Sequence, residues 1–182
     1  MPSEAIRTLR GFRQTRAFDE RPVPDEAMQQ ILEIGRWSGS SRNSQPWSFV
    51  VVTDREKLRR LAEVIPYGKW IDRAPCAIAL VMDGQGSGQS FDAGRLAERM
   101  MVAAHALGLG AGVATISEPE QERQALELLG VPAGHGLGVF LAIGYAAPRP
   151  EGTRPAAPRR PGAGRRPLGE LVHYQRYGQR RA

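Results

Sequence analysis

The sequence predicts a single α+β domain, because helix and strand patterns are mixed along the chain and few clean βαβ units occur. Two further observations fit a single globular domain. The 182 residues fit one domain, or a domain with arms, and can bury a substantial core. Hydrophobic residues make up 41% and charged residues 24%, the ordinary balance of a soluble globular protein.

Three helices and one strand are predicted in the first half of the chain. Apolar residues at helical spacing indicate a short helix over residues 3–13 and a second helix over Asp25–Trp37. Residues 38–46 are polar and rich in turn-forming residues. They lead into a predicted buried strand at 47–53, which is rich in β-branched residues. Asp54 is placed to cap a third helix, over residues 54–64.

The second half is predicted to hold three strands and two helices. The strands cover residues 76–82, 111–116 and 137–145. A glycine-rich loop at 83–90 precedes a long helix over 91–107, and the second half of this helix is apolar on nearly every side. A further helix runs from Pro119, in its first turn, to Leu129. Residues 146–167 contain six prolines and form an extended strap, after which apolar residues return in a segment that should dock on something.

Several functional classes are excluded by what the sequence lacks. No apolar run approaches the roughly 20 residues that span a bilayer, and the first residues lack the apolar stretch of a secretory signal. The single cysteine, Cys76, rules out a disulfide framework and is expected to be a structural thiol. No metal site is predicted, because the three histidines are widely separated, and His105 is expected to be a core histidine. We therefore expect a cytoplasmic protein.

Positive charge is concentrated at the end of the chain. Residues 149–182 hold nine Arg and two Glu, a net charge of +7, whereas the rest of the chain holds 16 basic and 17 acidic residues, a net charge of −1. A basic tail of this kind can bind nucleic acid, bind a phosphate as an arm, or simply be solvated. Arg outnumbers Lys 23 to 2, so the abundance of Arg is weak evidence for any one of these roles.

The glycine-rich loop does not predict a dinucleotide site. Gly84, Gly86 and Gly88 follow a strand, but their spacing is not the dinucleotide fingerprint and no acidic residue follows at a second strand end. No Gly-x-Ser-x-Gly element supports a hydrolase either.

Two polar segments are better candidates for a functional site. In F-R-Q-T-R-A-F, residues 12–18, two guanidinium groups stand three residues apart, a fork that can hold a phosphate while the flanking Phe side chains anchor the chain. In S-S-R-N-S-Q-P-W, residues 40–47, short polar side chains and backbone amides can bond a polar ring edge, and Trp47 fixes the loop to the core. Each segment could also be an ordinary surface turn.

Together these segments resemble the nitroreductase family of FMN-dependent oxidoreductases. The apolar helix that ends in A-L-G-L-G-A-G, the strand F-L-A-I-G-Y and the terminal R-R-P-L-G-E-L-V-H-Y fit the same family, so the similarity covers most of the chain. The resemblance implies an α+β nitroreductase-like homodimer with a central, mostly antiparallel sheet, flanking helices and a long buried helix. It also implies one FMN in each of two sites at the subunit interface.

The resemblance further implies which residues bind the cofactor. The family's first Arg motif contacts the FMN phosphate and ring edge, its polar loop reaches FMN from the other subunit, the strand after the central helix covers the flavin face with backbone, and the basic C-terminal element contacts the phosphate. These four elements correspond to Arg13, Gln14 and Arg16; to Gly39, Ser40, Ser41 and Asn43; to Ala114, Thr115 and Ile116; and to Arg165 and Arg166. The chain departs from the family pattern at three positions, where Phe12 replaces an Arg, Gln14 a Ser and Gly39 a Pro.

The implied activity passes electrons from NADH or NADPH through flavin N5 to a small organic acceptor, of the nitroaromatic or quinone type, by a ping-pong mechanism. No catalytic side chain is expected, because the cofactor carries the chemistry. Residues 1–146 would form the FMN-binding domain, and residues 147–182 an arm of the same domain that docks on the partner subunit. The expected partners are a second copy of the chain and the acceptor, with neither a membrane nor a nucleic acid.

Two other functions remain open at this stage. A specialised flavin enzyme that fragments flavin or removes halogen reductively would usually carry a lid insertion in mid-chain, for which only residues 83–97 are available. A nucleic-acid-binding protein could use the Arg-rich tail, but residues 149–167 contain no aromatic residue for stacking on bases.

Overall fold

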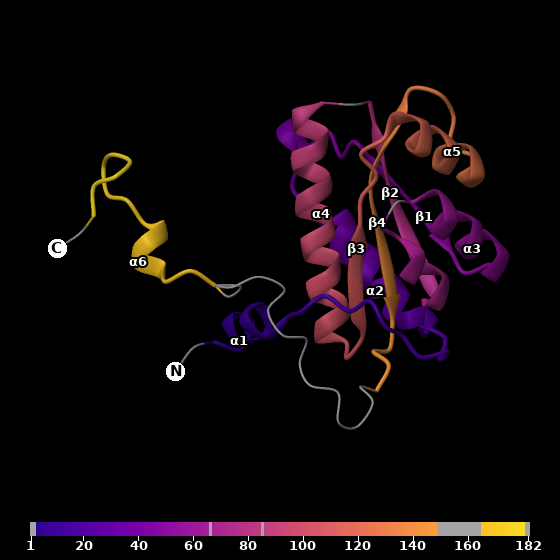
Figure 1. Ribbon diagram of the computed structural model, residues 1–182, viewed down its shortest axis with the longest axis horizontal. Helices are drawn as coiled ribbons and strands as arrows, with labels where there is room; N and C mark the ends of the chain where they lie inside the picture. Colours follow the sequence, from indigo (N-terminus) through magenta and orange to yellow (C-terminus); the bar gives the residue numbers. More distant parts are fainter. Residues whose placement is uncertain (1–2, 66, 85, 149–164, 181–182) are drawn as a thin grey trace. The chain divides into compact units, whose positions relative to one another are not determined.

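Four strands form one antiparallel sheet in the order β1-β2-β4-β3 (Figure 1). The structure is a computed structural model that describes residues 3–65, 67–84, 86–148 and 165–180. Its elements are α1 (Glu4–Gly11), α2 (Asp25–Arg36), η1 (Ser41–Asn43), β1 (Trp47–Val52), α3 (Arg55–Val64), η2 (Lys69–Arg73), β2 (Cys76–Asp83), α4 (Ser87–Ala106), β3 (Gly110–Ala114), α5 (Pro119–Leu129), β4 (His135–Gly144) and α6 (Leu168–Leu171). The predicted α+β class is confirmed.

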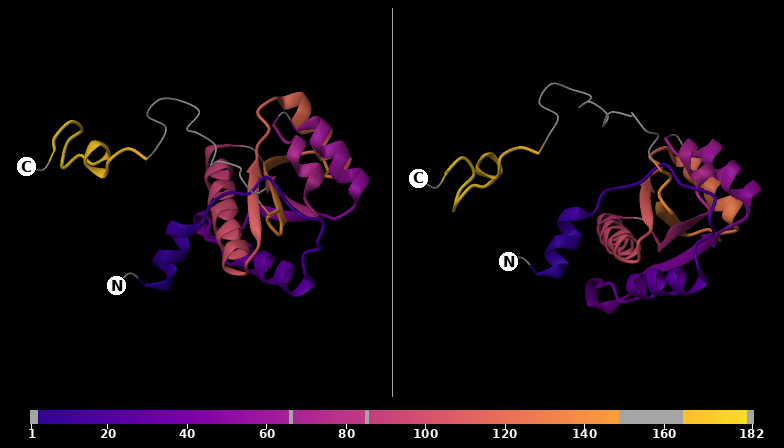
Figure 2. Two further views of the ribbon diagram at one scale, coloured as in Figure 1. Left: turned by 60° about the horizontal axis from the view of Figure 1, so that its bottom comes forward. Right: turned by 90° about the horizontal axis from the view of Figure 1, so that it is seen from below.

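Helices cover both faces of the sheet, with α2 and α4 on one face and α3 and α5 on the other (Figure 2). The alternation of side chains along β2 explains this arrangement, because successive residues point to opposite faces. Ile78 and Leu80 pack in the first layer with Met100 of α4, while Ala77 and Ala79 pack in the second. The small alanines leave room in the second layer for larger side chains from α3, such as Leu58 and Leu61.

Local capping chemistry explains why several helices begin and end where they do. The carboxylate of Asp54 accepts a hydrogen bond from the Lys57 amide at 2.7 Å and so starts α3, as predicted. Helix α5 has Pro119 in its first turn and ends at Gly130, whose φ of 70° is left-handed. The predicted bounds of this helix are therefore confirmed at both ends.

Two sequence predictions of local structure are wrong. Helix α4 begins at Ser87, so the predicted loop at 83–90 is shorter and the helix longer than expected. The added turn, residues 87–90, is exposed or half-buried, and the Ser90 amide and hydroxyl close it by donating to the Gly86 carbonyl at 3.0 and 3.1 Å, although glycine and serine are poor helix formers. Strand β1 was expected to be buried, but it is an edge strand, and Val52 is its one buried residue. β-branched residues suit edge and central strands alike.

The end of the chain, Arg149–Ala182, is a separate unit from Met1–Pro148. Within its described residues, the Tyr174 amide donates to the Gln179 carbonyl at 2.8 Å, and the rings of His173 and Tyr177 stack 4.2 Å apart. Arg180 donates to the carbonyl of Gly169. Most of the predicted strap, at 149–164, lies outside the described residues.

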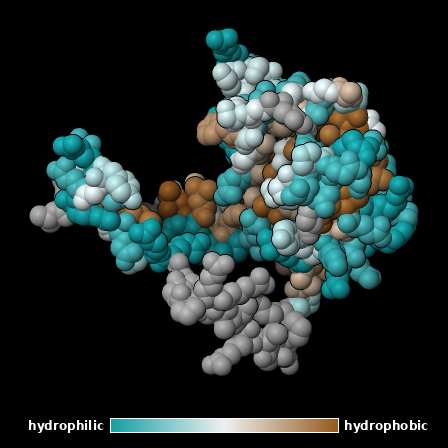
Figure 3. Space-filling model, turned by 45° about the horizontal axis from the view of Figure 1, so that its top comes forward, coloured by the Kyte–Doolittle hydropathy of each residue, from teal (hydrophilic) through white to brown (hydrophobic). Residues whose placement is uncertain are grey.

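Large hydrophobic side chains remain at the surface of the chain, and brown patches interrupt the hydrophilic surface in Figure 3. Their exposed fractions reach 55% for Leu9 of α1, 66% for Trp37 after α2 and 74% for Leu168 of α6. Helix α1 buries none of its residues. Within the described ranges, no helix combines the length and the apolar character needed to cross a membrane.

Candidate functional site

The first Arg motif lies against the outer edge of β3. The Thr15 amide donates to the carbonyl of Ala111 at 2.8 Å, and the Gln14 side-chain oxygen accepts from the amide of Val113 at 3.4 Å. Glycine makes this approach possible, because a Cβ on Gly112 would lie 2.3 Å from the Thr15 carbonyl oxygen. Residues 13–16 are therefore held beside the end of β3, where residues 114–116 follow.

Arg13 and Arg16, the two guanidinium groups of the predicted fork, have different partners in this structure. The Arg13 guanidinium donates to the carbonyls of Arg10 and Phe12, at 2.8 and 2.6 Å, and so completes the end of α1. Arg16 instead places its guanidinium carbon 5.6 Å from the centre of the Trp70 ring. Unpaired carbonyls at a helix end attract a nearby guanidinium, which sequence spacing does not reveal.

Trp70 is a neighbour of this site that the sequence analysis missed. Its ring stacks on Phe18 at 6.4 Å and its indole N–H donates to the Tyr67 carbonyl at 2.8 Å. It also lies 3.0 Å from the position of a Cβ on Gly112. Its one sequence signal is that an aromatic residue precedes the predicted strand at 76–82. Trp70 thus joins the first Arg motif to β3.

The predicted polar loop has a strained backbone. Arg42, Asn43 and Gln45 all have positive φ, at 52°, 55° and 49°, a region that side chains other than glycine seldom adopt. Such residues cost of order 1–3 kcal/mol each and gather at functional sites. The Ser40 hydroxyl accepts from the Gln45 amide at 2.8 Å and helps to hold this conformation. Trp47, directly after the loop, packs against the core as expected.

The polar loop and the first Arg motif contact different turns of α4. Gly39, at the start of the loop, accepts a hydrogen bond from Arg95 of this helix. The segment of the first Arg motif lies near the C-terminal end of α4, where the Phe12 ring is 5.9 Å from the half-buried His105 ring. Ten residues of helix separate the two contacts along the axis by about 15 Å. A single chain therefore holds the two predicted groups of cofactor ligands apart.

The other predicted ligands divide between the two units of the chain. Thr115 is exposed and Ile116 half-buried directly after β3, so backbone there is accessible beside residues 13–16. Arg165 and Arg166 belong to the terminal unit, where both are exposed and Arg166 pairs with Glu170 at 3.2 Å.

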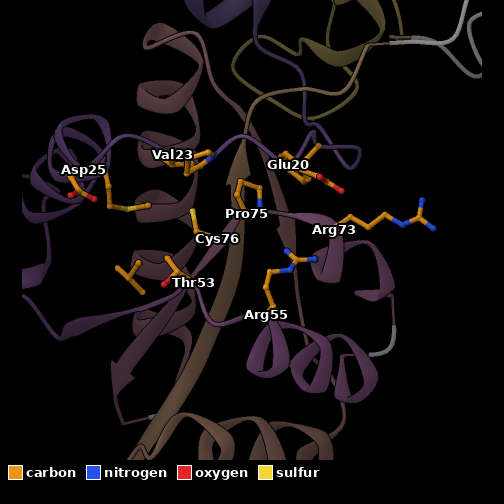
Figure 4. Close-up of a pocket in the computed structure, with 12 residues that line it drawn as sticks. Glu20, Val23, Asp25, Thr53, Arg55, Arg73, Pro75 and Cys76 are labelled. Carbon is orange, nitrogen blue, oxygen red and sulfur yellow. The ribbon is translucent and has the colours of Figure 1, made fainter.

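A cavity of about 860 Å³ lies where β1 ends and β2 begins (Figure 4). Its labelled side chains come from three segments: residues 20–25, residues 53–55 after β1, and residues 73–76 before and at the start of β2. Among the described residues, none of the predicted cofactor ligands lines it. Burial raises the pKa of the Cys76 thiol to about 12, and this thiol donates to the Ile143 carbonyl at 3.4 Å. Cys76 is therefore a structural thiol, as expected, and not a nucleophile.

Comparison with known proteins identifies the family to which the chain belongs. The model of the Nitroreductase family matches residues 9–66 and 66–145, so the chain belongs to that family. A protein of Archaeoglobus fulgidus, provisionally named NADH dehydrogenase/NAD(P)H nitroreductase, is 30% identical over 148 residues, which are 78% of this chain and 85% of the relative. A protein of the same name from Methanothermobacter thermautotrophicus is 33% identical, over 83% of this chain and 80% of its own length.

Solved structures of the same family share the fold. An FMN-dependent nitroreductase from Clostridium difficile superposes with a TM-score of 0.74 and 26% identity, over 82% of this chain and 91% of its own. The NADPH:FMN oxidoreductase of Vibrio harveyi, solved with NAD+, gives a TM-score of 0.79 and 25% identity, over 97% of this chain and 79% of its own.

Proposed function

We propose that this protein is an FMN-dependent oxidoreductase that passes electrons from NADH or NADPH to a small organic acceptor. One observation carries the proposal: the bonds from Gln14 and Thr15 to β3 place the first Arg motif beside residues 114–116. These are two of the segments that would bind FMN. The family membership and the names of the relatives support the same activity.

The donor groups of this region suit FMN. Arg13, Gln14 and Arg16 are exposed, and a guanidinium such as that of Arg16 matches the geometry and charge of a phosphate. The backbone amides of the exposed Thr115 and the half-buried Ile116 could donate to a polar ring edge. Gly39, Ser40, Ser41 and Asn43 would complete the site from a second chain, and Arg165 and Arg166 would add phosphate contacts.

Bound FMN would supply hydride chemistry at N5. The residues of the chain bind the phosphate, orient the ring and exclude competing groups, and no side chain needs to act as nucleophile or proton shuttle. We expect ping-pong kinetics, because donor and acceptor would use one open face in turn. Initial rates at several fixed acceptor concentrations should then give parallel double-reciprocal lines, whereas intersecting lines would contradict this order. Nitroaromatic and quinone acceptors are the classes to test first.

We also propose that the working unit is a homodimer in which the arm at 147–182 docks on the partner subunit. Two observations support it: the two ligand groups contact different turns of α4, and the terminal unit exposes Leu168, Leu171 and Tyr177. Exposed apolar side chains of this size favour a binding surface. The free edge of β1, with its adjoining cavity, is a surface that could receive such an arm. We place the enzyme in the cytoplasm, where NADH and NADPH are supplied.

The specialised flavin reactions receive less support from the fold. A lid would have to come from residues 83–97, but α4 is already helical from Ser87. Similarity to an iodotyrosine deiodinase of Danio rerio extends over 64 residues, 35% of this chain. We therefore prefer the simpler NAD(P)H oxidoreductase.

An absorbance spectrum of the purified, flavin-loaded protein tests the proposal. Flavin bands that bleach when NADH or NADPH is added without oxygen, and return when a quinone is added, are the expected result. Protein that binds flavin but is bleached by neither nicotinamide would overturn it.

A further inference from the structure

The polar loop is anchored to α4 by a side chain that no sequence motif marks. Arg95, one of whose guanidinium nitrogens donates to the Gly39 carbonyl, lies on α4 56 residues further along the chain. A second nitrogen lies 3.5 Å from a carboxylate oxygen of Asp92, and the guanidinium carbon lies 4.8 Å from the centre of the Phe91 ring. Arg95 is thus held on two sides within α4 while it reaches the loop.

Two buried polar residues lie beside the contact between Arg95 and Gly39. Among the described residues, Ser38 and Asp92 are the two polar or charged residues classed as buried, with 5% and 6% of their surface exposed. Ser38 directly precedes Gly39, and Asp92 is the partner of Arg95. A buried carboxylate requires a partner, and the Arg95 guanidinium, on a side chain that is 35% exposed, lies 3.5 Å from the carboxylate of Asp92. Both buried polar residues therefore lie at the joint between the loop and α4.

The lack of a side chain at Gly39 leaves space for the Arg95 guanidinium. A Cβ on Gly39 would lie 2.7 Å from the Arg95 nitrogen, closer than ordinary contact permits. Since that nitrogen is the end of a flexible side chain, a larger residue would displace the guanidinium rather than the backbone. Glycine at position 39 therefore leaves room for the Arg95 guanidinium.

We propose that Arg95, held by Asp92, is a positioning residue that fixes the strained loop of residues 40–45. The loop needs such support, because three of its residues have positive φ. Within the loop, the Ser40 hydroxyl accepts from the Gln45 amide at 2.8 Å and the Gln45 side-chain amide donates to the Asn43 carbonyl at 3.5 Å, whereas Arg95 contacts the loop from α4. The role of this loop in binding FMN rests on the proposed function. The anchoring itself is a property of the flavin-free chain, so the two claims can be tested apart.

Hydrogen exchange of the flavin-free protein tests the anchoring. Mass spectrometry would follow the peptide that spans residues 38–47 in wild type, Arg95→Ala and the control Arg99→Ala, which removes an exposed guanidinium one turn further along α4. We expect Arg95→Ala to speed exchange in this peptide about tenfold, the effect of losing a hydrogen bond to a charged group, and Arg99→Ala to leave it unchanged. Unchanged exchange in Arg95→Ala would overturn the proposal.

A double-mutant comparison separates positioning from a general loss of structure. Gly39→Ala should displace Arg95 and speed exchange as much as Arg95→Ala does, whereas the double variant should behave like either single variant. Lysine at position 95 keeps a donor for the Gly39 carbonyl, so Arg95→Lys should restore part of the protection. Additive effects of the two alanine substitutions would contradict the proposal, because they would show that the two residues act independently.

Titration with FMN then tests the link to the cofactor. If the wild type binds FMN, Arg95→Ala and Gly39→Ala should each raise the dissociation constant about tenfold, with Arg99→Ala unchanged. Normal FMN affinity in both variants would overturn the positioning role. If the wild type binds no FMN, the proposed function fails, while the exchange comparison still decides whether Arg95 anchors the loop.

Discussion

Thr15 and Gly112 are packed so closely that a methyl group on Gly112 would meet the Thr15 carbonyl oxygen at 2.3 Å. This contact joins the first Arg motif, near the start of the chain, to a strand almost one hundred positions later. The neighbouring bonds from Thr15 to Ala111 and from Gln14 to Val113 reinforce it. The position of the proposed FMN ligands thus depends on a glycine that is not itself a proposed ligand.

Gly112→Ala should therefore displace the first Arg motif. Because the added Cβ meets backbone, which cannot rotate away, we expect a loss of about 1–3 kcal/mol in the free energy of unfolding, together with weaker FMN binding. Gly88→Ala is the matched control, since nothing lies within 4 Å of the new Cβ on α4 and alanine favours helix. Urea unfolding of both variants provides the measurement. A Gly112→Ala protein as stable as wild type would show that the close contact is absent.

Arg16→Ala should weaken FMN binding by about 1.5–3 kcal/mol, the range for a hydrogen bond to a charged group. The flavin-free protein should lose little stability, because the guanidinium is exposed and its contact with Trp70 is worth about 0.5–1 kcal/mol. Flavin titration measures the first effect and thermal unfolding the second. Arg60→Ala, on the exposed side of α3, serves as the control. Equal FMN affinity in Arg16→Ala and wild type would mean that the phosphate binds elsewhere.

Cys76 should make stability fall at high pH. Burial raises its pKa from 9.0 to about 12, so the native state keeps its proton where the unfolded chain loses it. The resulting stability is complete below about pH 9 and is lost as the pH rises from there towards 12. The difference in unfolding free energy between wild type and Cys76→Ala, measured across this range, should shrink. A constant difference would contradict the raised pKa. A thiol reagent at pH 8 should label the protein only after unfolding.

Deletion of residues 149–182 should convert a dimer to a monomer and lower FMN affinity. The cut spares the bridge between Phe18 and Ala146 and the bond from the Ala147 amide to the Ala17 carbonyl, so the main unit keeps its own contacts. Light scattering gives the mass, and flavin titration gives the affinity. FMN should also stabilise the full-length dimer by mass action. A truncated protein that stays dimeric with wild-type FMN affinity would show that the arm contributes to neither dimerisation nor FMN binding.

Local signals in the sequence predicted most of the elements. Helix α5 was predicted from Pro119 to Leu129 because proline suits the first turn of a helix, which is a local signal, and the structure ends the helix at the left-handed Gly130. The edge position of β1 was missed because strand order depends on pairings between distant residues, which β-branched composition does not encode. The early start of α4 was missed because Gly84, Gly86 and Gly88 favour a loop, whereas the Ser90 amide closes a further helical turn on the Gly86 carbonyl.

For the candidate site, residue types were easier to predict than contacts. The polar loop and the first Arg motif were recognised from their composition, but the bonds from Arg13 to the carbonyls of Arg10 and Phe12 were not predicted. Trp70 and Arg95 carry no motif, because their roles come from long-range neighbours: Gly112 for the first and Gly39 for the second. Such contacts follow only from the packed structure.

Identification of the bound flavin tests the central claim most directly. The holo-protein, reconstituted with a mixture of FMN and FAD if it purifies without colour, would be denatured and the released flavin separated by chromatography. Arg13 and Arg16 on the main unit, with Arg165 and Arg166 on the arm, suit one terminal phosphate, so the account predicts FMN. Release of FAD, or of no flavin after reconstitution, would contradict it.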